Sequence, residues 1–322
     1  YNRNKFASAE FSNDKVVEKS TSKEIEIDLA ADIEDVIYGK ACYEDALKIY
    51  HNGYESAEST GIKQIDRIFK WKRGELTLLS GIGNFGKSEW LNFLMLNKSA
   101  KDGTKWGVFS PENNPASEFY HHLTEMVIGA NCTPFNSDGE VNHDKPPLDT
   151  YEAIYGFISE HIFYIYPKDL LPTPEYIRSR FLELVIKEKI SGCVIDPFNQ
   201  LSNDYGQRDD KYLETFLSEC TRFAVKNNVY YVIIAHPHKL QKDKDTKAYP
   251  CPDVFDLAGG AMWNNKADNI LVYHRPNHHT DPTDRVCELH SKKIRRQKIV
   301  GVKGVEQFDY DRKRRRFVFD NY

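Results

Sequence analysis

The chain has 322 residues, of which 40% are hydrophobic and 13% aromatic, enough to build the core of one large domain or of a domain with an appendage. Its net charge of −4 at pH 7 excludes a protein that binds polyanions through bulk positive charge. No apolar run approaches the length of a membrane span, and no signal-peptide pattern opens the chain. We therefore expect a soluble protein with no membrane partner.

Six cysteines are scattered along the chain without a CxxC pair. This pattern predicts isolated thiols in a reducing compartment rather than a zinc site or a disulfide framework. The first residue is Tyr1 rather than Met, so we expect a trimmed fragment of a longer protein.

The first 58 residues differ in pattern from the rest of the chain. Residues 1–29 are polar and charged without a sustained period, which is typical of a linker or tail. Apolar positions between Leu29 and Tyr50 are spaced for one or two amphipathic helices, so residues 30–58 are predicted to form a helical linker. We assign residues 59–322 to one main domain.

Strand and helix patterns alternate from residue 75 to residue 235. Short apolar runs predict strands at 75–80, 106–110, 162–166, 193–195 and 229–235. Helical spacing predicts helices at 87–99, 115–128, 174–189 and around 212–223. This order is typical of an α/β fold, in which helices cover a mostly parallel sheet.

Past about Val272 the pattern changes to strands and turns, with strands predicted at 285–290, 304–310 and 316–319. Turn residues predict surface loops at 131–150, 208–211 and 241–249. Residues 292–316 hold eleven lysines and arginines against three acidic residues, a charge excess suited to the phosphates of a nucleotide or of DNA. Most of the basic run 312–316 is interpreted as a solvated hairpin turn.

A phosphate-binding motif lies between the first predicted strand and the helix that follows it. The sequence GIGNFGKS at 81–88 matches G-x4-G-K-[ST], whose glycines let backbone N–H groups turn inward around a phosphate. Lys87 is expected to reach the β and γ phosphates of a nucleoside triphosphate, and Ser88 to ligate Mg²⁺. The predicted nucleotide-binding residues are Gly81, Gly83, Asn84, Phe85, Gly86, Lys87 and Ser88.

Two carboxylates follow later strands. Asp196 ends the strand at 193–195, where an acidic residue can hold the magnesium shell through water. Glu112 follows the strand at 106–110, which we expect to neighbour the phosphate-loop strand, and a carboxylate there can activate the attacking water. A helix cap and a solvated loop residue are the plain alternatives for these two positions.

Longer motifs extend this pattern along the chain. They are STGIKQIDRIFKWKRGELTLLSGIGNFGKS at 59–88, FSPEN at 109–113, VIDPFNQL at 194–201, IIAHPHKL at 233–240, DLAGGAMWNNKADN at 256–269 and KIRRQKIVGVKG at 293–304. In this order they resemble the motor domain of the DnaB-type superfamily 4 replicative helicases over about residues 30–320. The resemblance is strongest to the branch of the Twinkle-type mitochondrial helicases and the phage primase–helicases, and it implies a RecA-like P-loop core.

The resemblance also implies roles for individual residues. Glu112 matches the family's catalytic glutamate, and His236 its γ-phosphate sensor. Lys293 and Arg295 match a K-x-R pair that reaches the phosphates of the neighbouring subunit, with Arg295 as the arginine finger. If the alignment with the family motif is shifted by one residue, Arg296 takes that role instead.

Further positions match the family's contacts with the base and with DNA. Arg275 and Tyr310 fit the pair that sandwiches the nucleotide base. The loop after His236 resembles a channel loop that follows single-stranded phosphates, and the glycine pair 259–260 resembles a second one. The implied DNA-binding residues are Lys239, Lys242, Lys244, Gly259 and Gly260. Asn264 or Asn265 aligns with a family glutamine that this chain lacks.

The resemblance implies an ATP-driven replicative helicase that forms a hexameric or heptameric ring and translocates 5′ to 3′ on single-stranded DNA. ATP or another nucleotide, with Mg²⁺, would bind between subunits. A primase domain or protein and a replicative polymerase are the further partners that it suggests. The compartment would be the cytoplasm of a bacterium or phage-infected cell, or a mitochondrial or plastid matrix. A RecA- or RadA-type recombinase and a nucleotide-gated DNA clamp remain as alternatives.

Overall fold

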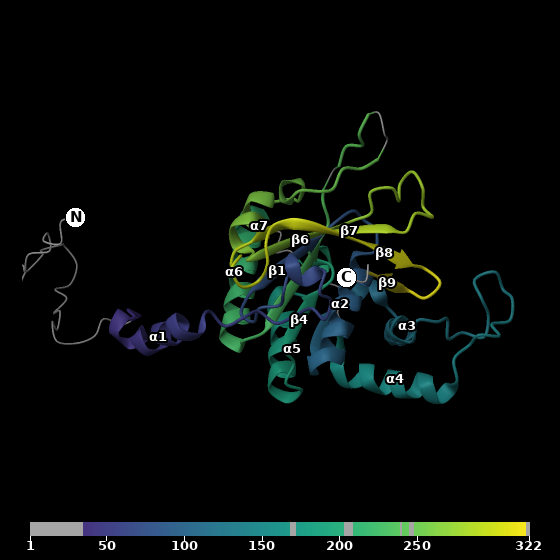
Figure 1. Cartoon of the computed structure of the whole chain (residues 1–322), viewed down its shortest axis with the longest axis horizontal. Helices are drawn as coiled ribbons and strands as arrows, with labels where there is room; N and C mark the ends of the chain where they lie inside the picture. Colours follow the sequence, from purple (N-terminus) through teal and green to yellow (C-terminus); the bar gives the residue numbers. More distant parts are fainter. Residues whose placement is uncertain (1–34, 168–171, 203–208, 239, 245–247, 320–322) are drawn as a thin grey trace, which may run out of the picture. The chain divides into compact units, whose positions relative to one another are not determined.

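The computed structural model describes residues 35–167, 172–202, 209–238, 240–244 and 248–319 (Figure 1). The predicted tail at 1–29 lies outside these residues. The chain divides into two compact units between Gly53 and Tyr54. The first contains the 3-10 turn η1 (Gly39–Cys42) and helix α1 (Tyr43–Asn52), which falls within the predicted helical linker. None of the side chains of these two elements is buried.

In the second unit, the described residues include nine strands that form one sheet in the order β3-β2-β4-β5-β1-β6-β7-β8-β9. The strands are β1 (Leu76–Ser80), β2 (Trp106–Phe109), β3 (Ile162–Ile165), β4 (Gly192–Ile195), β5 (Tyr230–Ala235), β6 (Asn269–His274), β7 (Val286–Ile294), β8 (Gly304–Asp311) and β9 (Arg316–Val318). Strands β1 to β6 pair in parallel, and β7 to β9 continue the sheet as antiparallel neighbours. The predicted α/β fold with a mostly parallel sheet is confirmed.

Helices cover both faces of this sheet. They are α2 (Lys87–Asp102), α3 (Ala116–Ile128), α4 (Leu148–His161), α5 (Pro174–Lys187), α6 (Asp209–Asn227) and α7 (Gly260–Lys266). Short 3-10 turns lie at η2 (Ile65–Arg67), η3 (Pro111–Asn113), η4 (Phe198–Gln200) and η5 (Val254–Asp256). The buried residues of α2, α3 and α4 pack in one core cluster, and those of α5, α6 and α7 in another.

The central strands β1, β2, β4, β5 and β6 are buried along their whole length because their two faces are covered by these two cores. Along β5, Tyr230, Val232 and Ile234 enter the first cluster. Tyr231, Ile233 and Ala235 enter the second. Alternate residues of one buried strand therefore fix both helical layers against the sheet.

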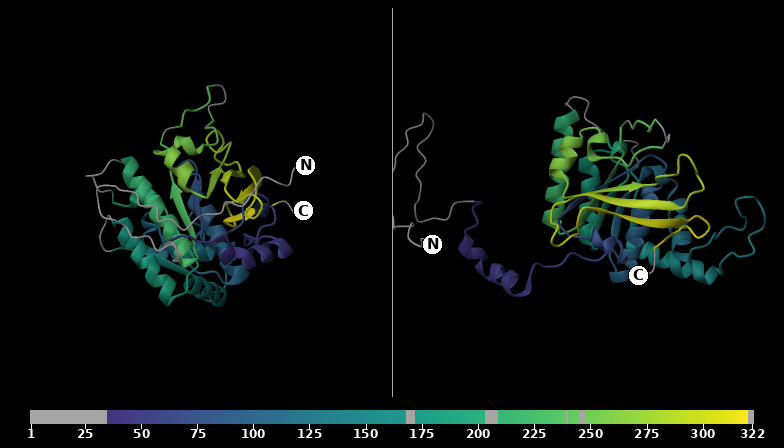
Figure 2. Two further views of the ribbon diagram at one scale, coloured as in Figure 1. Left: turned by 90° about the vertical axis from the view of Figure 1, so that its left-hand side faces the viewer. Right: turned by 45° about the horizontal axis from the view of Figure 1, so that its top comes forward.

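The C-terminal strands β7, β8 and β9, yellow in Figure 2, lie side by side beyond β6. Ile294 at the end of β7 pairs with Asn269 at the start of β6, and Ser291 pairs with Gly304. Consequently the basic residues 292–303 lie at the edge where the parallel strands begin, and residues 312–316 lie at the opposite end of these strands. The basic region is thus divided between the two ends of β7–β9, and its 312–315 segment is the predicted hairpin turn.

Several expectations need correction. Strand β2 is not a neighbour of β1, because β4 and β5 lie between them. Helix α4 was not predicted, and α6 begins at Asp209, inside a predicted loop. Strand β7 runs to Ile294 rather than ending at 290, so Lys293 belongs to a strand. Strand β6 and helix α7 were also not predicted.

Gly192 provides a test of this packing. A Cβ atom at this position in β4 would lie 2.0 Å from the ring of Trp106, which is fully buried. We expect Gly192→Ala to lower the free energy of unfolding by roughly 1–3 kcal/mol, because the core must shift to admit a methyl group. Urea denaturation measures the change.

Gly156→Ala is the matched control, since a Cβ there has no heavy atom within 4 Å in helix α4. It should raise stability by about 0.5–1 kcal/mol, as alanine does in place of an interior helical glycine. Equal effects of the two substitutions would contradict the packing described for Trp106.

Candidate active site

The phosphate-loop motif lies where β1 ends and α2 begins, at the carboxyl edge of the parallel strands. Gly81 follows Ser80 with φ of 149°, and a Cβ on Gly81 would lie 2.2 Å from the carbonyl oxygen of Tyr273. Gly86 caps α2 with φ of 97°, in the left-handed region. Glycine is therefore required at both ends of the loop, and the loop leads directly into the positive N-terminus of α2.

The other loop residues differ in their exposure to solvent. Gly83 and Asn84 are exposed at the tip of the loop, whereas Phe85 is buried. The ring of Phe85 lies edge-on to His278, with ring centroids 5.0 Å apart, and stacks on His274 at 6.4 Å. The ring of Phe85 thus fixes the loop to the end of β6 and the segment after it, and its role in binding nucleotide stays a prediction.

Lys87 is buried in the first turn of α2 and donates from Nζ to the carbonyl oxygen of Ile82 at 2.8 Å. Burial lowers its pKa to about 8, although the charges of Asp196 and Glu112 act in the opposite direction. An ammonium group held in this way gains strongly from a polyanionic ligand, because the ligand replaces the solvation that burial removed.

Asp196 follows β4 and is buried beside Ser88 and Ser110. The Ser110 hydroxyl donates to Oδ2 at 3.3 Å, and the Ser88 hydroxyl also bonds to this carboxylate. Burial raises the pKa of Asp196 to about 6 despite these bonds and the charge of Lys87. A hydroxyl and an uncompensated carboxylate beside a phosphate loop are the oxygen donors that Mg²⁺ accepts, so these two residues fit the predicted metal.

Glu112 and His236 complete the cluster at this edge. Glu112 is exposed in η3, and Gln200 Nε2 donates to its Oε1 at 3.0 Å. His236 follows β5 and is partly buried, with no hydrogen-bond partner for Nδ1 among the described residues. Burial and the charge of Lys87 lower the pKa of His236, while Glu112 acts in the opposite direction. The structure thus brings Lys87, Ser88, Asp196, Glu112 and His236 together.

Lys293 and Arg295 lie at the other edge of the sheet. Lys293 Nζ donates to the carbonyl oxygens of Asn264 and, at 2.8 Å, of Ala267. Arg295 follows β7, next to the start of β6. The whole length of β1 separates this edge from the chain's own phosphate loop, so these cations cannot reach phosphates bound to the same chain. A nucleotide phosphate that they contact would therefore be bound to the phosphate loop of another copy.

The two residues expected to sandwich the base are engaged within the chain. Arg275 is buried, and its Nη2 donates to the carbonyl oxygen of Asp284 at 2.6 Å. The Tyr310 hydroxyl donates to Glu89 Oε1 at 2.9 Å, and its ring packs on Phe317. A base between them would require Arg275 to leave its present contact, so this assignment remains a prediction.

The predicted DNA-binding segments also differ in their settings. Lys242 and Lys244 are exposed, with Lys242 beside His279 and over the ring of Tyr249, whereas Lys239 lies outside the described residues. Gly259 and Gly260 do not form a second loop, because they are the N-cap and the first residue of α7. Gly260 is buried, and a Cβ there would lie 2.4 Å from the carbonyl oxygen of Val254, so the close approach of the two backbones requires this glycine.

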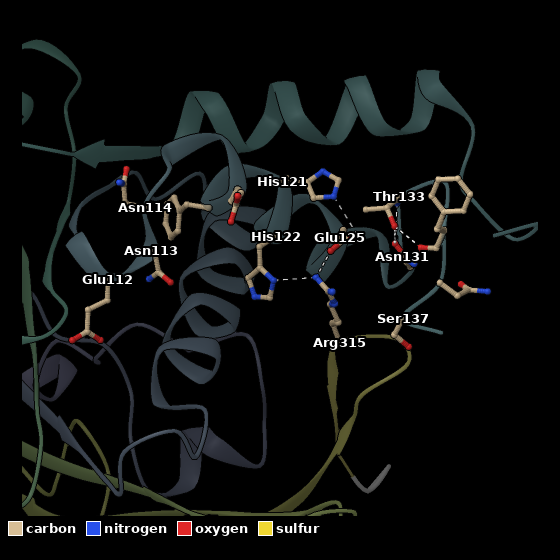
Figure 3. Close-up of a pocket in the computed structure, with 14 residues that line it drawn as sticks. Glu112, Asn113, Asn114, His121, His122, Glu125, Asn131, Thr133, Ser137 and Arg315 are labelled. Atoms are coloured by element: carbon tan, nitrogen blue, oxygen red, sulfur yellow. Dashed lines mark hydrogen bonds and ion pairs between the residues drawn. The ribbon is translucent and has the colours of Figure 1, made fainter. Parts of the chain in front are cut away.

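A cavity of about 590 Å³ extends from Glu112 along α3 (Figure 3). At its far side, Arg315 contacts both His122 and Glu125, and His122 also contacts Glu89. These contacts fix α3 to the hairpin between β8 and β9. Across the described residues, no three histidine, cysteine, aspartate or glutamate side chains are grouped to hold a metal ion. The cluster therefore anchors the helix that follows Glu112.

Three residues that contact the candidate site residues were not predicted from the sequence. Gln200 bonds to Glu112, Ser110 bonds to Asp196, and Asp268 forms an ion pair with Arg295. All three lie within motifs that were recognised, but only Gln200 and Ser110 lie at or after the end of predicted strands, which was an available signal. Asp268 follows a short helix without clear periodicity, and only the pairing of β6 with β7 brings it to Arg295.

Comparison with known proteins adds a relative and a fold. No family model matches the chain. It is 29% identical over 277 residues to the Twinkle homolog protein, chloroplastic/mitochondrial, of Arabidopsis thaliana, a match that covers 83% of this chain and 38% of that protein. The chain thus spans less than half the length of this curated relative. The similarity to the Twinkle branch expected from the motifs is confirmed.

Solved structures agree on the fold. A solved ATPase domain has a TM-score of 0.71 at 17% identity, covering 87% of this chain and 99% of that one. A DnaB-like replicative helicase, studied with its primase interactions, has a TM-score of 0.69 at 17% identity and covers 88% and 68%. The RadB recombinase reaches 0.50 at 17% identity, covering 80% and 97%. The second unit is therefore a RecA-like ATPase fold of the DnaB-helicase type. In the part of the chain that the structure describes, no helix is long and apolar enough to span a membrane.

The buried carboxylate of Asp196 makes a prediction about stability. Its pKa of about 6 lies above its ordinary value of 3.8, so the folded protein binds this proton more tightly than the unfolded chain does. Stability therefore falls as the pH rises from about 4 to about 6, and the cost is complete above pH 6. We expect Asp196→Asn to raise the free energy of unfolding of the ligand-free protein at pH 8 by roughly 3 kcal/mol, with no gain at pH 4.

Urea denaturation at the two pH values, without nucleotide or magnesium, measures this difference. Asp138→Asn, in an exposed loop, is the control and should change stability by less than about 0.5 kcal/mol at either pH. A loss of stability in Asp196→Asn at pH 8 would show that its hydroxyl contacts outweigh the cost of burying the charge.

Proposed function

We propose that this chain is the motor domain of a ring-forming, ATP-driven replicative DNA helicase, like its Twinkle relative over the region that the two have in common. Its rings would be hexameric or heptameric and translocate 5′ to 3′ on single-stranded DNA. One observation carries the proposal: the phosphate loop with its carboxylates and His236 lies at one edge of the sheet, and Lys293 and Arg295 lie at the other. A complete catalytic site then needs two copies of the chain, which a ring supplies.

In this proposal the phosphate loop binds the triphosphate of ATP. Backbone N–H groups and the N-terminus of α2 attract the phosphates, and Lys87 gives up its bond to Ile82 for the β and γ oxygens. Ser88 would ligate Mg²⁺ directly, and Asp196 would hold its water shell. When bound, the metal neutralises phosphate charge and supplies electrostatic stabilisation to phosphoryl transfer.

Glu112 would orient the attacking water and accept its proton. It is exposed enough to reach a water in front of the γ-phosphate, and Gln200 holds one of its carboxylate oxygens. His236, with Nδ1 free of partners in the described part of the chain, would contact the γ-phosphate and respond to its loss. Since β4 and β5 are adjacent, a movement of His236 would pass directly to the residues around Asp196.

Movement along DNA would depend on the segment that follows strand β5. His236 opens the segment that carries the exposed Lys242 and Lys244, and an isolated antiparallel bridge between Pro237 and Leu257 closes this segment at its base. Exposed lysines contact DNA phosphates without regard to sequence, as a translocating motor requires. Helix α1, which buries none of its side chains, would dock on an adjoining copy. A primase and a replicative polymerase are the partners that the proposal suggests.

The first test is hydrolysis and fork unwinding by Glu112→Gln. Glutamine keeps the shape of Glu112 but cannot accept the proton, so ATP turnover should fall by roughly 10²- to 10⁴-fold while nucleotide binding is retained. Steady-state ATPase with single-stranded DNA and displacement of one strand from a forked duplex measure the two activities. Glu118→Gln, in the exposed first turn of α3, is the control and should behave as wild type.

The wild-type protein decides between the proposal and its rivals. Hydrolysis without rings in electron micrographs, or without strand displacement, would refute the helicase. Open filaments would indicate a recombinase, and DNA binding without unwinding would indicate a clamp. Undiminished turnover by Glu112→Gln would remove Glu112 as the base.

Mixing two inactive variants tests whether the site is shared between copies. Lys87→Ala lacks the phosphate-binding lysine and Arg295→Ala lacks the arginine from the other edge, so each should lose turnover by about 10³-fold. In mixed rings with equal numbers of each, about one quarter of the interfaces would join two intact halves, and activity should return accordingly.

Lys87→Ala mixed with Glu112→Gln is the control, because both changes lie in the same half of the site and no interface is repaired. No recovery in the first mixture would place the arginine and the phosphate loop in the same half, and recovery in the control would place Lys87 and Glu112 in different halves.

A further inference from the structure

Two buried carboxylates face two arginines at the edge where the parallel strands begin. Asp268, just before β6, and Glu75, just before β1, are both almost fully buried. Asp268 Oδ1 lies 2.8 Å from Arg295 Nη1, and Glu75 Oε1 lies 3.1 Å from Arg296 Nε. Each of the two candidate arginine fingers therefore has its own carboxylate partner.

Asp268 is built firmly into the sheet. Its Oδ2 accepts from the backbone N–H of Leu76 at 2.9 Å, and its own N–H donates to the carbonyl oxygen of Leu76 at 2.9 Å. Its carbonyl oxygen accepts from the backbone N–H of Arg295 at 3.0 Å. The carboxylate that faces Arg295 is thus fixed to the first residue of β1 and to the end of β7.

Arg295 and Arg296 are held to different degrees. Besides its ion pair with Asp268, Arg295 donates from Nη2 to the carbonyl oxygen of Asn265 at 3.1 Å. The side chain of Arg296 has the ion pair with Glu75, whose Oε1 lacks a well-formed hydrogen bond. Burial and the charge of Asp268 raise the pKa of Glu75, which weakens it further as an anionic partner, although Asn269 and Arg296 oppose the shift.

The contacts of Arg295 leave it able to act on a neighbour. A guanidinium has five N–H donors. The hydrogen bond to Asn265 uses one of those on Nη2, and the ion pair with Asp268 is made on the side of Nη1. Nearly half of the side chain, 46%, is exposed to solvent. Arg295 can therefore remain fixed on one side and present its remaining donors to an oxyanion on the other, which is the pre-organised arrangement that stabilises charge in a transition state.

We propose that Asp268 is a positioning residue that fixes Arg295 as the arginine acting on the neighbouring copy's nucleotide and thereby selects Arg295 over Arg296. This inference rests on the proposed function, because it requires a shared site. It adds a further residue to the half of the site opposite the phosphate loop. Asp268 itself touches no phosphate and acts through Arg295.

Asp268→Asn is the direct test. Asparagine keeps the size of the side chain and an oxygen for the N–H of Leu76, but it loses the charge that holds Arg295. We expect kcat for DNA-stimulated ATP hydrolysis to fall on the order of 10²-fold, as for a misplaced catalytic group, with KM for ATP and the ring mass unchanged. Glu75→Gln is the matched control at the same edge, and its turnover should stay within about twofold of wild type.

Mixed rings separate positioning from structural damage. Asp268→Asn subunits keep an intact phosphate-loop half, so mixing them with Lys87→Ala should restore activity as Arg295→Ala does, and mixing them with Arg295→Ala should not. The double variant Asp268→Asn/Arg295→Ala should turn over no more slowly than Arg295→Ala alone, because Asp268 acts only through that arginine.

Each other outcome overturns the inference. Unchanged turnover in Asp268→Asn would show that Arg295 needs no carboxylate, and increased turnover would make Asp268 a latch that holds the arginine back. An equal loss in Glu75→Gln would give the role to Arg296 or to the edge as a whole. If Asp268→Asn does not assemble, Asp268→Ser, whose hydroxyl can accept from Leu76, replaces it, and failure of both would make the role structural. An inactive wild-type protein would instead refute the proposed function.

Discussion

The parallel pairing of β4, β5, β1 and β6 is the constraint on which the site depends. Ser80, Ala235 and Val272 stand level with one another in this pairing, so the segments that follow these strands start from the same edge. Lys87, Asp196 and His236 are separated by long stretches of sequence, and the register alone brings them together. The same register places Arg295 beside the beginning of β1, at the opposite edge. One set of backbone hydrogen bonds thus gathers the residues around the phosphate loop at one edge and fixes their distance from Arg295 at the other.

Much of this arrangement could be predicted from the sequence, for local reasons. The phosphate loop is a strand, a glycine turn and a helix within consecutive residues, and Asp196 and Glu112 closely follow apolar runs that form strands. Alternation of apolar strands and helical stripes was sufficient to predict the sheet and its covering layers. The similarity to helicases extended this reasoning to His236, Lys293 and Arg295.

What could not be predicted depends on contacts between distant segments. The sequence of a single strand does not determine its neighbours in the sheet, and β2 was wrongly placed beside β1. Helix α4 buries Ile158 alone among its residues and carries Gly156 in its interior, so its apolar stripe is weak. The glycine pair at 259–260 suggests a loop, but Gly260 is needed because a helix begins there against the backbone of Val254. The partnership of Asp268 with Arg295 exists only through the pairing of β6 with β7.

In the absence of ligand, the buried charges of this site lower the stability of the folded chain. Burial disfavours the charged forms of both Lys87 and Asp196, and their mutual attraction only partly offsets this cost. Ligands that satisfy both groups will bind the folded chain and not the unfolded one. Under the proposed function, nucleotide supply would determine how long the molecule survives: without ATP the chain would open more often and be exposed to proteases, and with ATP bound it would resist them.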